Sequence, residues 1–510
     1  MGTAKLNPTR WVERIEQASP FLAIGAGVWF FLATAWELFG PLPGGHLGNA
    51  TGAAIAGENM LRWHVFGAAL EYTAKPPVPA QLYCHHPYGV FIAEAISHAI
   101  FGHGWASVKL PALVMSALTP WLLYRFARSM WGAVAAAIAT LTFTLIPIDL
   151  AFSSFSSLEV MVIFFGLLFS WATARLWQTW RAIYLLPATI GALGACHSDW
   201  VGLVLVGTVG IMSFVRVYVL TPSAPVSHER HAKWFAWVTA AAVSTLLLYI
   251  ALFAKAGKLG DLLSSAEMRS AGANAGWRNV FGQRRVMWVL LMLPLPALAA
   301  IAIGPLVSAL RTLGVGMARR KPVELIAVAW MIAASFQYFV FRQGADVHIF
   351  WPHYFGVVAA LGFGVLAEVL TPSLETLATA QLRSTTRATL SLAPLSLLLL
   401  GVMLIGRVGV VQLAQSRLTG GRFDDGGRYI AVDQDRARFV EWAVRDLPAV
   451  APSAFIARSF THGASSTPRV VRSRRSARLA RSPTRAPTSC WSTVDTRQRL
   501  SFAPSQPVLP

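Results

Sequence analysis

Two adjacent histidines stand in the stretch Cys84-His85-His86-Pro87-Tyr88-Gly89, at the end of a long polar segment and just before the chain turns apolar again. Neutral imidazoles ligate metal ions, and protonated imidazoles bind anions such as phosphate. Adjacent side chains point in different directions on most backbones, so we expect at most one of the pair to take part in chemistry. The alternative reading is a polar loop that binds nothing.

Composition indicates where such a loop must lie. The chain has 510 residues, of which 55% are hydrophobic and only 13% are charged. The apolar residues come in long runs, and a bilayer core needs roughly 20 of them per helix. Backbone polar groups in lipid must be satisfied within a segment. The sequence therefore predicts an all-α polytopic membrane protein. Three cysteines are too few and too scattered for a disulfide framework.

The formal charge of +20 does not indicate a nucleic-acid partner, because many of the basic residues lie on short loops between apolar runs. Lysine and arginine on such loops set the orientation of the spans. With residues 1–19 in the cytoplasm, every inside loop is basic. The first apolar run reads as a retained anchor. We expect a bacterial inner (cell) membrane protein with an external C-terminus and about eleven spans: 20–39, 107–125, 131–150, 158–177, 182–197, 200–219, 234–254, 286–310, 323–342, 352–370 and 388–412.

These spans form a transmembrane domain over 20–413 with two long external loops, 40–106 and 255–285. Within the first loop, short apolar helices are expected over 52–65 and 90–101, lying along the interface. Ionised groups in a bilayer cost about 2.5–3.5 kcal/mol each, so those at span ends tend to face a cavity. The outside ends are rich in such groups, which predicts a polar external cavity; wet span ends are the alternative.

Three short motifs follow one another along the chain on the predicted external side: His85-His86-Pro87, Lys109-Leu110-Pro111 and Ser157-Leu158-Glu159. Together with the large first loop they resemble the GT-C membrane glycosyltransferases, in particular the protein O-mannosyltransferases and the lipid A aminoarabinose transferases. The resemblance covers about residues 10–415. It implies an enzyme that moves a sugar from a polyprenyl-phosphate donor to a lipid, glycan or protein acceptor on the external (periplasmic) face.

The resemblance also implies a general base, because the attacking acceptor hydroxyl must lose a proton. The family has an aspartate early in the first loop, and the alignment on Ala56 to Leu61 puts Asn49 near that position. An amide cannot take a proton. His46, Glu58 and Glu71 are the alternatives, of which Glu58 is preferred. Glu159 matches the family's second acid, which contacts the donor or a metal.

Further candidates follow from the same comparison. Cations or a metal must stabilise the departing phosphate, and guanidinium groups match phosphate oxygens. The donor phosphate or metal site is assigned to His85, His86, Asp149, Asp199, Arg269 and Arg278, with a divalent cation placed at His85, His86 and Glu159. The acceptor or sugar pocket is assigned to Asp346, His348 and His353.

The C-terminal part changes character. Residues 414–466 read as the start of an external soluble segment, with a turn at 426–430 and a helix near 438–442. Residues 467–510 are rich in Arg, Ser and Pro and cannot bury a core, which predicts disorder. A reading-frame shift is the preferred origin of this tail.

Two other function classes stay open. One is a transporter or flippase of a lipid-linked or anionic solute, which should show paired repeats that we do not find. The other is a catalytically inactive GT-C-like subunit, which Asn49 suggests.

Overall fold

Helices dominate the computed structural model, which describes residues 8–35, 38–39, 47–71, 73, 75–220, 228–271, 283–314, 322–379, 396–412, 421–423 and 429–431. All of them belong to one unit, Met1–Gly463. The tail over 467–510 and the helix expected near 438–442 lie outside the described residues.

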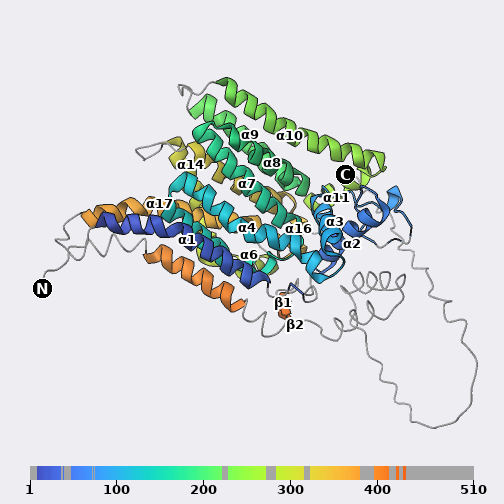
Figure 1. Ribbon diagram of the computed structural model, residues 1–510, viewed down its shortest axis with the longest axis horizontal. Coiled ribbons are helices and arrows are strands. Elements are labelled where there is room, and N and C mark those ends of the chain that lie inside the picture. The colour runs from blue at the N-terminus through green and yellow to red at the C-terminus, as the bar shows by residue number, and fades with distance from the viewer. Residues whose placement is uncertain are drawn as a thin grey trace, which may run out of the picture. The chain divides into compact units, whose positions relative to one another are not determined.

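The elements follow one another along the chain as shown in Figure 1. The helices are α1 (Pro8–Thr34), α2 (Leu47–Trp63), α3 (Gly89–Phe101), α4 (Trp105–Trp131), α5 (Ala133–Leu145), α6 (Pro147–Phe152), α7 (Leu158–Thr179), α8 (Leu185–Ser198), α9 (Trp200–Phe214), α10 (His228–Lys255), α11 (Leu259–Ala271), α13 (Gln283–Met292), α14 (Leu295–Leu313), α15 (Leu325–Ser335), α16 (Arg342–Val347) and α17 (Tyr354–Thr379). A further helix covers Ser396–Gln412.

Shorter pieces connect them. Single 3-10 turns lie at Pro79–Gln81, Ala182–Tyr184 and Pro322–Glu324, and π-helical turns at η4 (Val215–Leu220) and η6 (Phe336–Val340). Strands β1 (Gly421–Phe423) and β2 (Tyr429–Ala431) pair antiparallel. Tyr429 and Ile430, which were expected in a turn, therefore belong to a strand.

Among the described residues, six helices are long and apolar enough to cross a membrane: Glu16–Thr34, Trp105–Trp131, Leu158–Thr179, Trp200–Val219, Ala232–Lys255 and Leu295–Leu313. The prediction of a helical, multi-pass membrane protein is confirmed. Where the sequence predicted short helices over 52–65 and 90–101, the structure has α2 (Leu47–Trp63) and α3 (Gly89–Phe101).

Proline divides two of the predicted spans, which corrects the sequence reading. The run over 131–150 is two helices, because Ile146 is extended (ψ 130°) before Pro147 begins α6. The run over 286–310 is also two, because extended Pro294 (ψ 156°) precedes α14. Proline lacks the amide hydrogen that a helix needs and disfavours helical geometry in the residue before it.

Close helix crossings hold the bundle together. Helix α7 packs against α4 and α8, and α17 packs against α5 and α14. A Cβ atom on Gly304 of α14 would lie 2.3 Å from the Cα atom of Gly362 on α17. Small residues at such a crossing let two backbones approach, which is the usual basis of packing between membrane helices.

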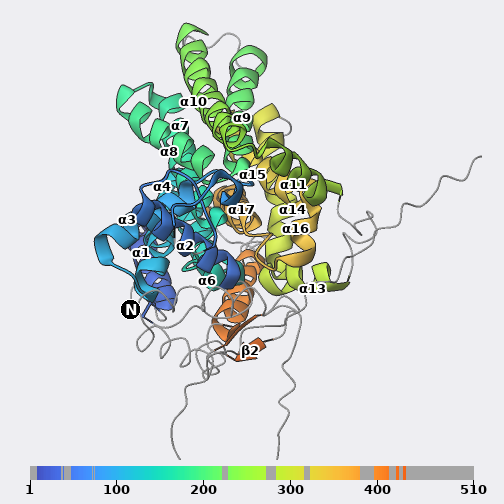
Figure 2. The ribbon, with the colours of Figure 1, turned by 90° about the vertical axis from the view of Figure 1, so that its right-hand side faces the viewer.

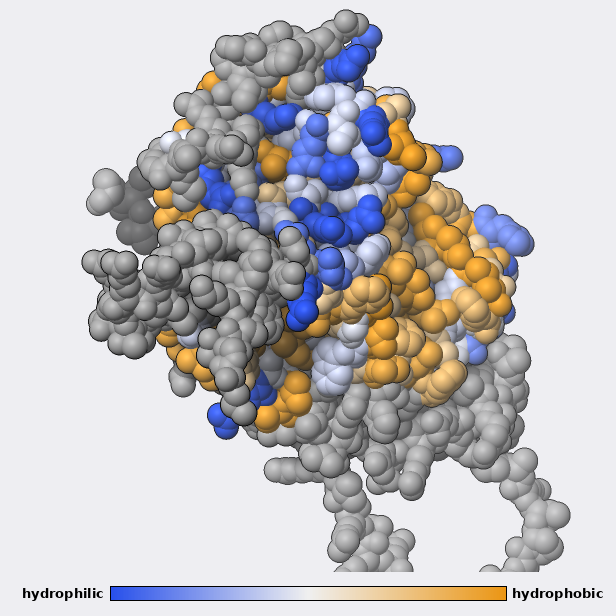
Figure 3. Space-filling view, turned by 60° about the vertical axis from the view of Figure 1, so that its left-hand side comes forward, coloured by the Kyte–Doolittle hydropathy of each residue, from blue (hydrophilic) through white to orange (hydrophobic). Residues whose placement is uncertain are grey.

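The two ends of the bundle differ. Helices α2, α3, α11 and α16 gather at the right-hand end in Figure 1, and they face the viewer in Figure 2. At the other end, Arg125 lies over the rings of Trp121 and Trp171, and Arg216 lies over Trp177. Figure 3 brings the left-hand side of Figure 1 forward. It shows hydrophilic residues gathered beside a continuous hydrophobic surface. Polar ends and apolar flanks are what a bilayer requires.

Candidate functional site

A cavity of about 300 Å³ is lined by residues of α2, α3, α11 and α16. Five of the residues singled out from the sequence line it: His86, Glu159, Asp199, Arg269 and His348. Its other walls come from Gly52, Ala53, Leu70, Tyr83, Val90, Phe91, Ser156, Ser157, Leu158, Met268, Gln343, Gly344, Phe350 and Trp351. The cavity thus combines one guanidinium, two carboxyl groups and several aromatic rings.

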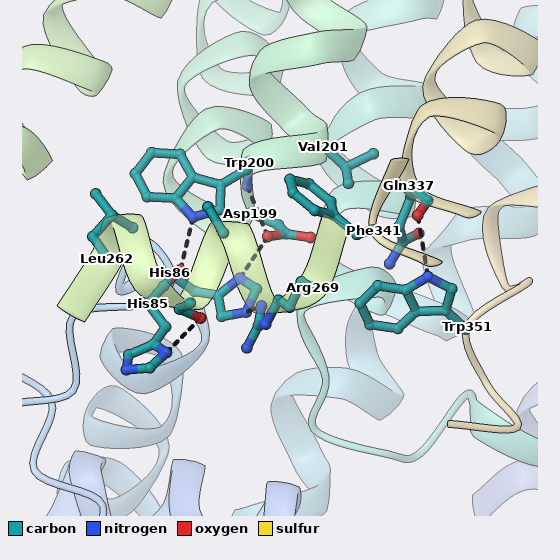
Figure 4. A pocket seen from close by; sticks show the side chains of 12 residues that line it. His85, His86, Asp199, Trp200, Val201, Leu262, Arg269, Gln337, Phe341 and Trp351 are labelled. Atoms are coloured by element: carbon teal, nitrogen blue, oxygen red, sulfur yellow. Dashed lines mark hydrogen bonds and ion pairs between the residues drawn. The ribbon is translucent and has the colours of Figure 1, made fainter. Parts of the chain in front are cut away.

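A chain of side-chain contacts joins Arg269, His86 and Asp199 (Figure 4). Arg269 Nη1 contacts His86 Nε2, and His86 Nδ1 lies 2.8 Å from Asp199 Oδ1. Arginine can only donate hydrogen bonds, so Nε2 must accept. This network assigns the neutral tautomer, in which Nδ1–H donates to Asp199. Burial, and secondarily Arg269, lower the pKa of His86, against the opposing effect of Asp199.

Asp199 is fixed by the junction between α8 and α9. It is the N-cap of α9, and its Oδ1 also accepts a hydrogen bond from the Trp200 backbone N–H at 2.7 Å. The Trp200 indole N–H donates to the carbonyl oxygen of His85 at 2.7 Å. A Cβ atom on Gly89 would lie 2.6 Å from the carbonyl oxygen of His197, so only glycine fits there. These contacts pin the two-histidine loop to the junction.

His85 points away from its neighbour, as expected for adjacent residues. Its Nδ1 lies 2.8 Å from Ser265 Oγ on α11, and its ring stacks on Tyr83 with centroids 4.9 Å apart. Burial, then Arg269 and His86, lower the pKa of His85. His85 lines a smaller neighbouring pocket, while only His86 reaches the larger cavity.

Glu159 enters the cavity from the first turn of α7, where Ser157 caps the helix by accepting from the Val160 N–H. Its side chain is buried, and Gln337 Nε2 donates to its Oε1 at 3.4 Å. Gln337 lies on the π-turn η6, and its carbonyl oxygen accepts from the Trp351 indole at 3.2 Å. Gln337 was missed in the sequence, although an amide inside an apolar run was the available signal.

Glu94 was also missed. It is fully buried on α3, and the hydroxyl of cavity-lining Ser156 contacts its Oε1. Ser156 Oγ lies 2.6 Å from the carbonyl oxygen of Val108 as well. A hydroxyl has one hydrogen and can donate to only one of these two oxygens. If it donates to Val108, the Glu94 carboxyl must donate to it and is therefore protonated, which also avoids burying a charge.

Two other candidates form a separate pair. Asp149 and His353 lie 3.2 Å apart, are 1% and 3% exposed, and border a much smaller pocket with Phe30 and Ser116. The pair bridges α6 and the segment that precedes α17. Neither residue lines the larger cavity, although the sequence assigned Asp149 to the donor phosphate or metal site and His353 to the acceptor or sugar pocket.

Glu58, the preferred base from the sequence, pairs with His103 at 2.8 Å and does not line the cavity. Gly52 and Ala53 present the cavity-facing side of α2. At about 100° per residue, Glu58 lies roughly 140–240° around the helix from them. Asn49 lies one turn before Gly52 in the same helix.

The remaining residues assigned from the sequence cannot be placed at the cavity. The side chains of Asn49 and Asp346 are not described, and His46 and Arg278 lie outside the described residues. Glu71 is described and exposed, and it does not line the cavity.

A divalent cation does not fit the donors as they are placed. Both nitrogens of His86 are engaged, His85 faces α11, and Glu159 contacts Gln337. Among the described residues no three His, Cys, Asp or Glu side chains form a group that could hold a metal ion.

Comparison with solved structures identifies the fold. The oligosaccharyltransferase of Archaeoglobus fulgidus superposes with a TM-score of 0.54 at 15% identity, covering 91% of this chain and 62% of that one. The same enzyme, AglB, in complex with an inhibitory peptide and a dolichol-phosphate gives 0.52 at 13% identity, covering 87% and 60%. The chain therefore has a GT-C fold, as expected from the sequence. It spans less than two thirds of that relative's length.

Sequence comparison adds a short match. The chain is 31% identical to Bacillus subtilis YkcB, to which a mannosyltransferase activity is attributed, over 115 residues that make up 22% of this chain and 14% of that protein. No family model matches. ArnT from Cupriavidus metallidurans gives a TM-score of 0.45, too low to decide between branches of the fold.

Proposed function

We propose that this protein is a membrane glycosyltransferase that moves a sugar from a polyprenyl-phosphate donor to an acceptor hydroxyl. One observation carries the proposal. In a GT-C fold, the cavity sets Arg269, held by His86 and Asp199, within the same enclosure as the carboxyl group of Glu159. A fixed guanidinium and a nearby carboxylate are the two groups that this reaction requires.

The chemistry assigns a role to each group. The acceptor oxygen attacks the anomeric carbon of the sugar, and the bond from that carbon to the phosphate oxygen breaks. The electron pair leaves with the polyprenyl phosphate, whose charge Arg269 stabilises through charge-assisted hydrogen bonds. The acceptor proton goes to Glu159 as general base. Asp199 already receives two hydrogen bonds and serves to orient His86.

The donor class is supported by apolar surface at the cavity. Met268 lines the cavity beside Arg269 and is 51% exposed, and Leu263 on the same helix is 69% exposed. Exposed apolar side chains next to a cation suit a lipid with an anionic head. In the relative AglB, a dolichol-phosphate is bound.

We further propose the finer topology read from the sequence. It places about eleven spans in a bacterial inner membrane, the N-terminus in the cytoplasm, and the cavity and the C-terminus on the periplasmic side. The domain limits 20–413, 414–466 and 467–510 belong to the same proposal. His103, whose side chain is 66% exposed, provides the test. In a background with Cys490 replaced by serine, His103→Cys should react with a membrane-impermeant maleimide added outside intact cells. Labelling only after lysis would show that the orientation is the reverse of the one proposed.

The activity is tested with purified protein in nanodiscs and radiolabelled polyprenyl-phosphate hexoses. Glu159→Gln should abolish transfer while polyprenyl phosphate still binds. Exposed Glu267 on α11 provides the matched control, and Glu267→Gln should behave as wild type. Transfer that survives in Glu159→Gln but not in Glu58→Gln would move the base to Glu58. A folded wild-type protein that neither transfers nor hydrolyses any donor would favour the inactive subunit.

The mechanism proposed uses no metal, because Arg269 supplies the positive charge at the phosphate. A structure of the A. fulgidus relative is a complex with Zn and sulfate. Dialysis against EDTA tests the point here, and we expect the transfer rate to stay unchanged. Loss of transfer that Mn²⁺ or Mg²⁺ restores would require a divalent cation at the site.

A further inference from the structure

A second, smaller cavity of about 30 Å³ adjoins the first and shares His86, Asp199, Arg269 and Trp351 with it. Figure 4 shows Gln337, Phe341 and Trp351 on one side of this small cavity and His85, Trp200 and Leu262 on the other, with Arg269 and Asp199 between them. A space of about 10–15 Å³ on this measure holds one water molecule. The small cavity therefore accepts a group about as large as a hydroxymethyl.

Gln337 reaches this cavity because of an irregularity in its helix. Helix α15 ends at Ser335, and the π-turn η6 over Phe336–Val340 continues it. Such turns are rare and tend to occur at functional sites, where the local unwinding aims a side chain or frees a backbone group. Here the turn puts a 2% exposed amide among Phe341, Trp351 and Arg269.

The orientation of the amide follows from its neighbour. Gln337 Nε2 faces Glu159 Oε1 at 3.4 Å, and the opposite orientation would set a carbonyl oxygen against a carboxyl oxygen. The hydrogen-bond network thus fixes where Oε1 lies. Oε1 is buried and accepts no hydrogen bond from any residue in the part of the chain that the structure describes. Buried acceptors nearly always have a partner, so an unpaired one beside a cavity suggests a substrate atom.

We propose that Gln337 and the small cavity form a subsite for a sugar hydroxyl, whose hydrogen is donated to Gln337 Oε1. The inference rests on the proposed function and names the group by which this site recognises its substrate. A hydroxyl suits the surroundings because it donates to Gln337 and accepts from Arg269 at the same time. A protonated amine would be repelled by Arg269. The rings of Phe341 and Trp351 supply apolar faces for the carbon side of a sugar.

The hydroxyl belongs either to the donor sugar or to a glycan acceptor, and binding measurements separate the two. The test variant is Gln337→Met, which keeps the length of the side chain and removes its acceptor. The control is Gln178→Met, which makes the same substitution at the end of α7 far from Glu159. Dissociation constants are measured in nanodiscs for polyprenyl-phosphate mannose, for its deoxy analogues and for polyprenyl phosphate without sugar.

Binding of the sugar-bearing donor should weaken roughly tenfold in Gln337→Met, with binding of sugar-free polyprenyl phosphate unchanged. One deoxy analogue should bind wild type and variant alike, and it identifies the hydroxyl. If donor binding is unchanged but the acceptor KM rises by a similar factor, the hydroxyl belongs to the acceptor, which also supports the subsite.

Two results overturn the inference while the proposed function stands. One is an active wild type whose donor binding and acceptor KM are both unaffected by Gln337→Met. The other is equal weakening for donors with and without sugar, which indicates a structural role. A wild type that binds no polyprenyl-phosphate donor refutes the proposed function itself, and the inference falls with it.

Discussion

Arg269→Gln should weaken the binding of polyprenyl phosphate, because Arg269 is the only basic side chain among the described residues that line the larger cavity, His86 and His348 apart. One N–H of the guanidinium contacts His86 and Tyr83 also interacts with the group, and a guanidinium has further N–H groups that can donate to phosphate oxygens. Glutamine keeps a donor for His86 but removes the positive charge. The variant therefore isolates the contribution of the charge.

The size of the effect follows from the kind of bond that is lost. Hydrogen bonds to charged groups contribute about 1.5–3 kcal/mol. Arg269 is half-buried, so solvent screens part of its charge, and a value near 2 kcal/mol is reasonable. At 1.4 kcal/mol per factor of ten, the dissociation constant should rise about 30-fold. Arg269→Lys should lose less, because an ammonium keeps the charge but not the planar fork.

The assay is native mass spectrometry of the protein in nanodiscs titrated with polyprenyl phosphate. Lys258→Gln is the matched control, since Lys258 begins the same segment but pairs with Asp261 and does not line the cavity. Both variants lower the net charge by one. Equal weakening in the two variants would show that net charge, and not a phosphate site at Arg269, governs binding, and an unchanged Arg269→Gln would refute the reasoning outright.

The remaining predictions concern the surroundings of the site. Glu94→Gln should unfold within a degree or two of wild type, because a neutral amide replaces a protonated acid, whereas Glu94→Leu should melt several degrees lower in a thermal scan. The pKa of His86 is lowered in the fold, so its contacts contribute fully above its ordinary pKa and are lost as the pH falls through the lower folded value. Donor affinity should therefore drop as the pH falls below about 6.5 and through the lowered pKa of His86, and it should stay flat in His86→Asn; tighter binding at acidic pH would contradict this. A Cβ atom on Gly344 would lie 2.3 Å from the Trp351 ring, so Gly344→Ala should impair donor binding while Gly260→Ala, with open space around it, should not.

Much of the fold could be read from the sequence because length and hydropathy of apolar runs reflect the bilayer directly. The runs that became α4, α7 and α10 are examples. The breaks at Pro147 and Pro294 were missed because an average over a window hides a single residue. The prolines themselves were the signal, since each removes one backbone donor.

The candidate site could be predicted in part. His86, Glu159 and Asp199 stood out because ionisable groups beside apolar runs are costly and therefore rare, and Arg269 because a guanidinium matches phosphate oxygens. Their mutual contacts could not be foreseen. His86 is 113 residues from Asp199 and 183 from Arg269, and no local periodicity encodes such a pairing.

Gln337 and Glu94 carry the same sequence signal as Glu159. Each is a polar residue within an apolar helix, so the cost that marked Glu159 applied to them as well. Glu58 is a different case. It was favoured by its place in an alignment, but its angle around α2 directs it to His103 and away from the cavity.

The π-turn at Phe336–Val340 makes the number of residues in this segment as important as their identity. Such a turn is equivalent to one extra residue within an α-helix. Deleting one residue there would restore regular geometry and rotate the flanking segments against each other by roughly 100°. Gln337 could then no longer face both Glu159 and the small cavity. A single-codon deletion, without any substitution among the residues that line the cavity, would thereby change what this site recognises.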